Sequence, residues 1–126
     1  MLTAPKLAGY AGNINSDTLK NPNYRKVIAT GKKLQLVLMS LKAGEEIGNE
    51  VHPKTDQFFR IEKGKAQFIL DAKEAHVLGD GGAVIVPAGT YHNVINAGKG
   101  DLKLYTIYAP PEHPKGTIEK TKRFER

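Results

Sequence analysis

The chain has 126 residues, 40% of them hydrophobic and 25% charged, which is the composition of one compact globular domain with a single core. It has no cysteine and no apolar run of about 18 residues, which excludes a disulfide-stapled secreted domain and a membrane-spanning helix. The opening stretch, MLTAPKLAGY, lacks the basic start and apolar segment of a secretory signal, so we expect a cytoplasmic protein.

The net charge of +6 does not indicate a nucleic-acid-binding protein. Such proteins usually interleave basic residues with aromatic ones on one face, and this chain has no tryptophan and no recognisable module. We interpret the charge as solvated surface and expect no nucleic-acid partner, although its field could attract an anionic substrate. Much of the charge lies near the C-terminus, at Lys115, Lys120, Lys122, Arg123 and Arg126.

In chain order, residues 1–29 predict an irregular N-terminal arm, since they contain Asn13, Asn15, Asn21, Pro22 and Asn23. LQLVLMSL at 34–41 predicts a largely buried strand. QFFRIE at 57–62, the turn KGK and AQFIL at 66–70 then predict a hairpin.

Four more strand-like runs follow: AHVL, AVIVP, HNVIN and LKLYTIY, separated by GDGG, PAG and NAGKGD. No stretch among them has the 3.6-residue period of a helix, so residues 30–110 predict an all-β sandwich or barrel. Residues 111–126 are expected to form a short C-terminal surface extension.

Polar residues with ligand chemistry stand at the start of the first hairpin. Glu50 and His52 are two positions apart, and in a strand such residues point to the same face. PKTD at 53–56 suits a turn, after which Gln57 opens the next strand. If Gln57 faces the same interior, three side-chain donors converge from two antiparallel strands. Phe59 and Ile61 would then share the face of Gln57, with the residues between them pointing outward.

A second group lies in PAGTYHNVIN, where the strand after the turn places His92, Val94 and Asn96 on one face. Periodicity alone makes a lone histidine more often a core or surface residue than a ligand. His76, in KEAHVLGD, is expected to be structural or exposed. For His113, in PPEHP, we favour a position away from the site, although a tail can fold across the mouth of a barrel.

Two long patterns give the chain a specific resemblance to the cupin superfamily. The stretch GEEIGNEVHPKTDQFFRIEKG, from Gly44 to Gly64, is similar to the family motif G-x5-H-x-H-x4-E-x6-G in all its gaps. The stretch GGAVIVPAGTYHNVIN, from Gly81 to Asn96, matches the second motif, G-x5-P-x-G-x2-H-x3-N. The resemblance covers about residues 30–110.

The resemblance implies a double-stranded β-helix barrel, a jelly-roll form, with a divalent metal ion held near one mouth. Carried over position by position, the metal ligands are Glu50, His52, Gln57 and His92. The family's first histidine has become Glu50 and its glutamate has become Gln57, so one formal negative charge is kept but moved. Glu50, His52 and His92 form a two-histidine, one-carboxylate set, which suits Fe(II), Mn(II) or a related ion such as Ni or Zn. Gln57 could complete the set or hydrogen-bond a ligand.

The expected cavity is largely apolar and suits a small, partly hydrophobic substrate. Its lining residues are predicted to be Phe59, Ile61, Val94 and Tyr108, with Leu38 or Met39. Glu50 is the predicted catalytic group, as a labile ligand or a base, because Gln57 cannot titrate. We also consider a barrel that kept the fold and lost the ion.

The leading hypothesis is a metal-dependent enzyme acting on a small organic molecule, with oxygenase chemistry favoured over isomerase or lyase chemistry. Mannose-6-phosphate isomerases resemble such chains loosely but are larger, and this chain lacks their extra elements that hold a sugar phosphate. The alternative is a non-catalytic barrel that binds or senses a small molecule. By the same resemblance we expect a homodimer, with the N-terminal arm able to supply a swapped strand, and no membrane partner.

Overall fold

A computed structural model describes residues 9–122, and within this range the chain forms one short helix and nine strands. Each of the strands expected between residues 34 and 108 is confirmed to within one residue at either end. The elements are α1 (Ile14–Lys20), β1 (Arg25–Thr30), β2 (Gln35–Leu41), β3 (Asp56–Lys63), β4 (Ala66–Leu70), β5 (Glu74–Leu78), β6 (Ala83–Val86), β7 (His92–Asn96), β8 (Leu102–Ala109) and β9 (Ile118–Glu119).

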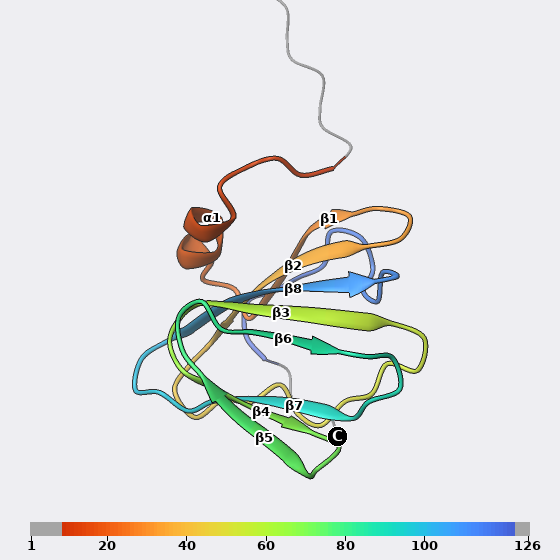
Figure 1. The fold of residues 1–126 in the computed structure, drawn as a ribbon. Helices are drawn as coiled ribbons and strands as arrows, with labels where there is room; N and C mark the ends of the chain where they lie inside the picture. Colours follow the sequence, from red (N-terminus) through yellow and green to blue (C-terminus); the bar gives the residue numbers. More distant parts are fainter. Residues whose placement is uncertain (1–8, 123–126) are drawn as a thin grey trace, which may run out of the picture.

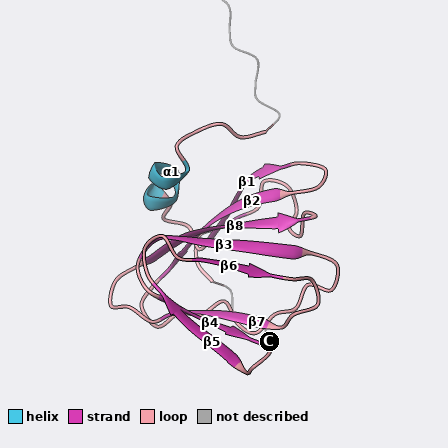
Figure 2. Ribbon diagram, in the orientation of Figure 1, coloured by secondary structure: helices cyan, strands magenta, loops and turns pink. Residues whose placement is uncertain are grey.

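Two antiparallel sheets face each other and enclose the interior (Figure 1). The larger sheet has the strand order β6-β3-β8-β2-β1-β9, and the smaller has the order β5-β4-β7. The segment between β2 and β3 extends the smaller sheet beyond β7, through bridges from Glu46 to Ile95 and from Glu50 to His92. This arrangement confirms the predicted all-β class, and the helix lies outside both sheets (Figure 2).

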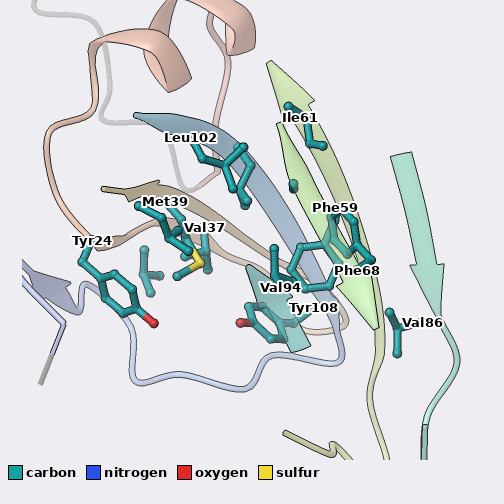
Figure 3. Close-up of a cluster of buried hydrophobic side chains, with 14 residues drawn as sticks. Tyr24, Val37, Met39, Phe59, Ile61, Phe68, Val86, Val94, Leu102 and Tyr108 are labelled. Carbon is teal, nitrogen blue, oxygen red and sulfur yellow. The ribbon is translucent and has the colours of Figure 1, made fainter. Parts of the chain in front are cut away.

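The hydrophobic core fills the space between the sheets (Figure 3). Along β3 the side chains alternate between buried and less buried, with Gln57, Phe59 and Ile61 turned inward as the two-residue period predicts. The rings of Phe59 on β3 and Phe68 on β4 meet edge to face with centroids 5.3 Å apart. Because each buried phenylalanine contributes about 1.5–3 kcal/mol, this pair is a strong link between the sheets.

The turn from β3 to β4 requires a glycine. Gly64 has a φ of +112°, in the region that L-residues with a side chain rarely adopt. A Cβ at this position would lie 3.1 Å from both the carbonyl oxygen of Asp101 and the Cα of Leu102. The close approach of the two loops explains on physical grounds why the first motif ends in glycine.

The segment expected as an irregular N-terminal arm contains two regular elements, while residues 1–8 of that segment lie outside the described range. Asn13 caps α1 by accepting a hydrogen bond from the Ser16 amide at 2.9 Å, and Thr18 is the buried residue of the helix. After Asn21 the chain enters β1, which pairs antiparallel with β2 along its length. The prediction of an irregular arm is therefore wrong for residues 14–20 and 25–29. Within residues 9–122, no helix is long and apolar enough to cross a membrane.

The C-terminal extension is more ordered than expected, up to the end of the described range at residue 122. Its strand β9 pairs with the start of β1, opposite Arg25 and Lys26. The amide of Val27 also donates to the carbonyl of Thr117 at 2.8 Å. The tail therefore covers the edge of β1 that β2 leaves free. Arg123 and Arg126, predicted to carry part of the surface charge, lie outside the described residues.

Candidate metal centre

Glu50 and His92 stand directly opposite each other on the extension of the smaller sheet. The amide of each donates to the carbonyl of the other, both at 2.8 Å. Residues paired in this way carry their side chains on the same face of the sheet. Two predicted ligands from distant motifs are thus brought together by backbone pairing alone.

His52 lies between two carboxylates. Its Nε2 is 3.8 Å from Oε2 of Glu50, and its Nδ1 is 3.6 Å from Oε1 of Glu112. The side chain of His52 is 11% exposed, against 34% for Glu50. The sequence patterns indicated Glu50 but gave no sign of Glu112.

His92 is buried and its ring orientation is fixed. Its Nδ1 lies 3.0 Å from the carbonyl oxygen of Thr90, which can only accept a hydrogen bond. Nδ1 therefore carries the hydrogen, and Nε2 keeps a free lone pair. Burial lowers the pKa of His92 below its usual value, which favours this neutral form. The His92 ring lies 5.4 Å from that of His52 and 6.0 Å from that of Phe59, between centroids. His92 is therefore in the state that a metal ligand requires.

Gln57 enters the same interior from β3. Its Nε2 donates to Oγ1 of Thr106 at 2.9 Å. Its Oε1 is buried and has no hydrogen-bond partner among residues 9–122. An unpaired buried carbonyl oxygen is unfavourable, and a cation is one group that would satisfy it.

Tyr108 and His113 form the neighbouring wall. The Tyr108 ring lies 5.6 Å from that of His52, and its hydroxyl lies 3.2 Å from Nε2 of His113. Burial raises the pKa of Tyr108, and burial together with the Arg25 guanidinium lowers the pKa of His113 to about 4. Near neutral pH both side chains are therefore uncharged.

The position favoured for His113, away from the site, is wrong, because the tail folds against the barrel. Gln35 is fully buried on β2, and its side-chain amide bonds to the backbone of the tail. Its Oε1 accepts from the amides of Glu112 at 3.1 Å and His113 at 3.0 Å, and its Nε2 donates to the His113 carbonyl at 2.8 Å. The one sequence feature related to this contact is a glutamine in the mostly apolar run LQLVLMSL, and it does not identify the partner.

The other residues predicted to line the cavity belong to the packed core. Ile61 and Val94 are fully buried within it, as is Met39. Phe59 is also in the core, but its ring borders His92, and Tyr108 borders His52. Leu38 is buried as well, but it is not part of that core cluster. His76 is exposed on β5, 2.6 Å from Glu74, as expected for a histidine outside the site.

Three of the predicted metal ligands, Glu50, His52 and His92, lie near one another within the described residues, in a loose arrangement. Donors that share one ion lie about 3 Å from each other, whereas His52 and Glu50 are 3.8 Å apart. In the range 9–122, no three His, Cys, Asp or Glu side chains are grouped tightly enough to hold an ion as they stand. The chemistry nevertheless fits a divalent cation, because one carboxylate, two imidazoles and an unpaired amide oxygen belong to the same part of the interior.

A separate surface cavity of about 670 Å³ contains none of these donors. Its lining mixes lysines with acidic residues, including Lys42, Glu45 and Lys120. Lys103, also on its wall, is held by the carbonyl of Asn21 at 2.7 Å and the hydroxyl of Ser40 at 2.9 Å. The candidate site is therefore the part of the barrel interior where the predicted ligands lie, and this cavity is not part of it.

Comparison with known proteins supports the same assignment of fold. The model of the cupin domain family matches residues 37–108. The uncharacterized protein YrkC of Bacillus subtilis (strain 168) is 50% identical over 115 residues, which are 87% of this chain and 62% of YrkC. The chain therefore spans less than two thirds of that relative.

Solved structures give the same fold. The crystal structure of BH2720 from Bacillus halodurans is 42% identical, with a TM-score of 0.86 and 88% of each chain covered. An RmlC-like protein of Methanocaldococcus jannaschii, described as a double-stranded β-helix, matches with a TM-score of 0.64 at 20% identity, over 70% of this chain and 80% of that one. The double-stranded β-helix expected from the motifs is confirmed.

Proposed function

Because the chain belongs to the cupin domain family, we propose that it is a metal-binding cupin and a metal-dependent enzyme acting on a small organic molecule. The family fixes the barrel but not the chemistry, which has to be argued from the site. The relatives described above carry no assigned activity in their names. The proposal rests on the donors that converge in the interior.

The observation that carries the proposal is the oxygen of Gln57. The bond from its Nε2 to Thr106 fixes the amide, and its Oε1 is left buried and unpaired within the described part of the chain. On the opposite sheet, His92 keeps a free Nε2, since its Nδ1 is bound to Thr90. A divalent cation is the common partner that would satisfy a neutral amide oxygen and a neutral imidazole nitrogen at once.

We propose Glu50, His52 and His92 as the ligands, with Gln57 as a fourth ligand or a hydrogen-bond partner of one of them. Two imidazoles and one carboxylate suit Fe(II) or Mn(II), and Ni(II) or Zn(II) are compatible with the same donors. When bound, such an ion supplies Lewis-acid or O₂-activating chemistry at positions left open to substrate.

The protein side chains define which chemistry is favoured. Gln57 carries no titratable proton, so a substrate cannot be deprotonated by the residue at that position. Glu50 is the carboxylate of the set and, with 34% of its side chain exposed, could reach a small molecule entering the barrel. With no base at position 57 and Glu50 engaged as a ligand, oxygenase chemistry is favoured over isomerase and lyase reactions that begin with proton abstraction.

Elemental analysis tests the metal proposal directly. Protein purified without added metal is expected to contain about one divalent ion per chain, and His92→Ala and Glu50→Ala should each lose most of it. His76→Ala, which removes an exposed histidine from β5, is the matched control and should keep the wild-type content. Equal metal content in all four proteins would overturn the assignment.

A non-catalytic barrel that binds a small molecule is the second candidate. It is favoured by the neutral Gln57, which stands where the family has a glutamate. Oxygen-uptake, isomerase and lyase assays on metal-loaded protein separate the two functions. Turnover that disappears in His92→Ala supports the enzyme, while stoichiometric metal without turnover in any of these assays supports the binding barrel.

A further inference from the structure

Glu112 approaches His52 from the side opposite to Glu50. Nδ1 of the imidazole faces Oε1 of Glu112 at 3.6 Å, and Nε2 faces Oε2 of Glu50 at 3.8 Å. The motif patterns did not include Glu112, which belongs to the C-terminal tail beyond the second motif.

The carboxylate of Glu112 is held in place although a third of its side chain is exposed. Thr55, which is buried, donates its hydroxyl to Oε1 of Glu112 at 3.0 Å. The backbone amide of Glu112 donates to Oε1 of the buried Gln35 at 3.1 Å. These two contacts, from the start of β2 and from the turn before β3, hold the carboxylate beside the histidine.

The two sides of the His52 ring have different roles. A histidine binds an ion through one nitrogen while the other usually donates to an oxygen that fixes the ring. Glu50 is paired backbone to backbone with His92, so an ion shared by His52 and His92 belongs on the Nε2 side of His52. Nδ1 is then the nitrogen that needs an acceptor.

His92 already shows this arrangement. Its Nδ1 is bound to the carbonyl of Thr90 at 3.0 Å, which leaves Nε2 free. At His52 the corresponding acceptor is a carboxylate, and a small rotation of either side chain would shorten 3.6 Å to hydrogen-bond length. Both imidazoles would then offer Nε2 to the same interior.

We propose that Glu112 is a positioning residue that accepts the Nδ1 proton of His52 and so presents Nε2 of that ring to the metal. This inference rests on the proposed function, since it assigns a role toward the same ion. It makes the C-terminal tail part of the site, because Glu112 reaches His52 only while Gln35 and Thr55 hold it.

Zinc affinity tests the proposal, measured by competition with a chromophoric chelator. Losing the partner that orients a ligand typically weakens metal binding about 10–100-fold, and this is the expected effect of Glu112→Ala. Glu112→Gln keeps an oxygen for Nδ1 and should lie between Ala and wild type. Thr55→Val, which releases the carboxylate but leaves it present, should show a smaller loss in the same direction.

A matched control and a second readout separate positioning from general damage. Glu74→Gln removes a carboxylate 2.6 Å from the exposed His76 and should bind zinc like wild type. The Co(II) absorption spectrum should change in Glu112→Ala, while the unfolding midpoint of the metal-free protein stays close to that of wild type.

The outcomes distinguish the two proposals. Wild type that binds zinc beside a Glu112→Ala variant of equal affinity would overturn the role of Glu112 and leave the metal site standing. Loss of affinity in Glu74→Gln equal to that in Glu112→Ala would overturn it too. Wild type that binds neither Zn(II) nor Co(II) would overturn the proposed function, and the role of Glu112 with it.

Discussion

Gln57 donates its side-chain amide to the hydroxyl of Thr106 across neighbouring strands of the larger sheet, at 2.9 Å. Thr106 is itself fully buried, so the pair fixes the amide group in a region that water does not reach. The Gln57 carbonyl is left without a partner among the residues that the structure describes. In the metal-free protein this unpaired carbonyl is unfavourable, and a bound cation would give it a partner.

Gln57→Glu tests how the stability of the protein, with and without metal, depends on a neutral side chain at position 57. A carboxylate buried at this position should lower the free energy of unfolding of the metal-free protein by about 1–3 kcal/mol. With Zn(II) or Mn(II) present the same variant should gain more stability than wild type, because the added charge faces the ion. Thermal unfolding with and without metal measures both effects. Gln67→Glu on β4 is the control. If Gln57→Glu had the wild-type unfolding midpoint both with and without metal, the prediction would be wrong.

Arg25 and Glu119 form an ion pair that joins β1 to β9. The side chain of Arg25 is only 12% exposed and lies over the Tyr24 ring, 5.2 Å from its centroid. Glu119→Gln leaves this largely buried charge without its carboxylate, so we expect a loss of stability of about 1–3 kcal/mol in urea unfolding. Combining it with Arg25→Met should recover part of the loss, since no unpaired charge remains. Additive losses would show that the pair does not stabilise the fold.

His113 predicts a pH dependence. Its pKa is about 4 in the fold and about 6.5 when unfolded, because burial disfavours the charged ring. Between these values the unfolded chain binds more protons, so stability should fall as the pH falls from about 6.5 to 4, and the His113 contribution should level off below that. The loss due to this group is expected to be on the order of 1–3 kcal/mol.

The contribution of His113 is isolated by comparing stability curves of the metal-free protein. His113→Gln should show a smaller decline than wild type over this range, since glutamine does not titrate. His76→Gln removes an exposed histidine and should run parallel to wild type. If the stability of His113→Gln declined with falling pH as steeply as that of wild type, the explanation would be wrong.

The outer face of the larger sheet carries an apolar row. Ile85 on the edge strand β6 is 67% exposed and lies opposite Phe58, which in turn lies opposite Ile107. We propose that this row is the contact face of a homodimer, since exposed apolar patches often mark interfaces. Wild type should be a dimer by light scattering after gel filtration, and the Ile85→Lys variant should be largely monomeric. Val77→Lys, on the exposed strand β5, should not, and a monomeric wild type would contradict the proposal.

The sequence was most informative where hydrophobic period and turn residues agree. β4 and β7 were predicted to the residue because each is a short β-type run that follows a glycine-containing turn. The N-terminal elements escaped prediction, since α1 is a short helix of seven residues and β1 mixes charged with β-branched residues. Their formation depends on packing against β2 and β8 more than on local pattern.

The candidate site divides in the same way. The four predicted ligands lie within two motifs whose gaps fix strand register, and the backbone pairing of Glu50 with His92 brings those motifs together. Glu112 and His113 reach the site through a tail whose course depends on side-chain contacts with Gln35 and Thr55. No periodicity in the tail encodes those contacts, so only the structure could place these residues.

Gln35 has a consequence for any shortened form of the protein. Its amide makes three hydrogen bonds to the backbone of residues 112 and 113, from a position with no exposed surface. Trimming the chain back to Pro110 would leave its Oε1 without these partners and its Nε2 with only the hydroxyl of Thr30, to which it donates at 3.0 Å. We therefore expect truncation to lower the free energy of unfolding of the barrel. A protease that removes the tail would then destabilise the protein without cutting either motif.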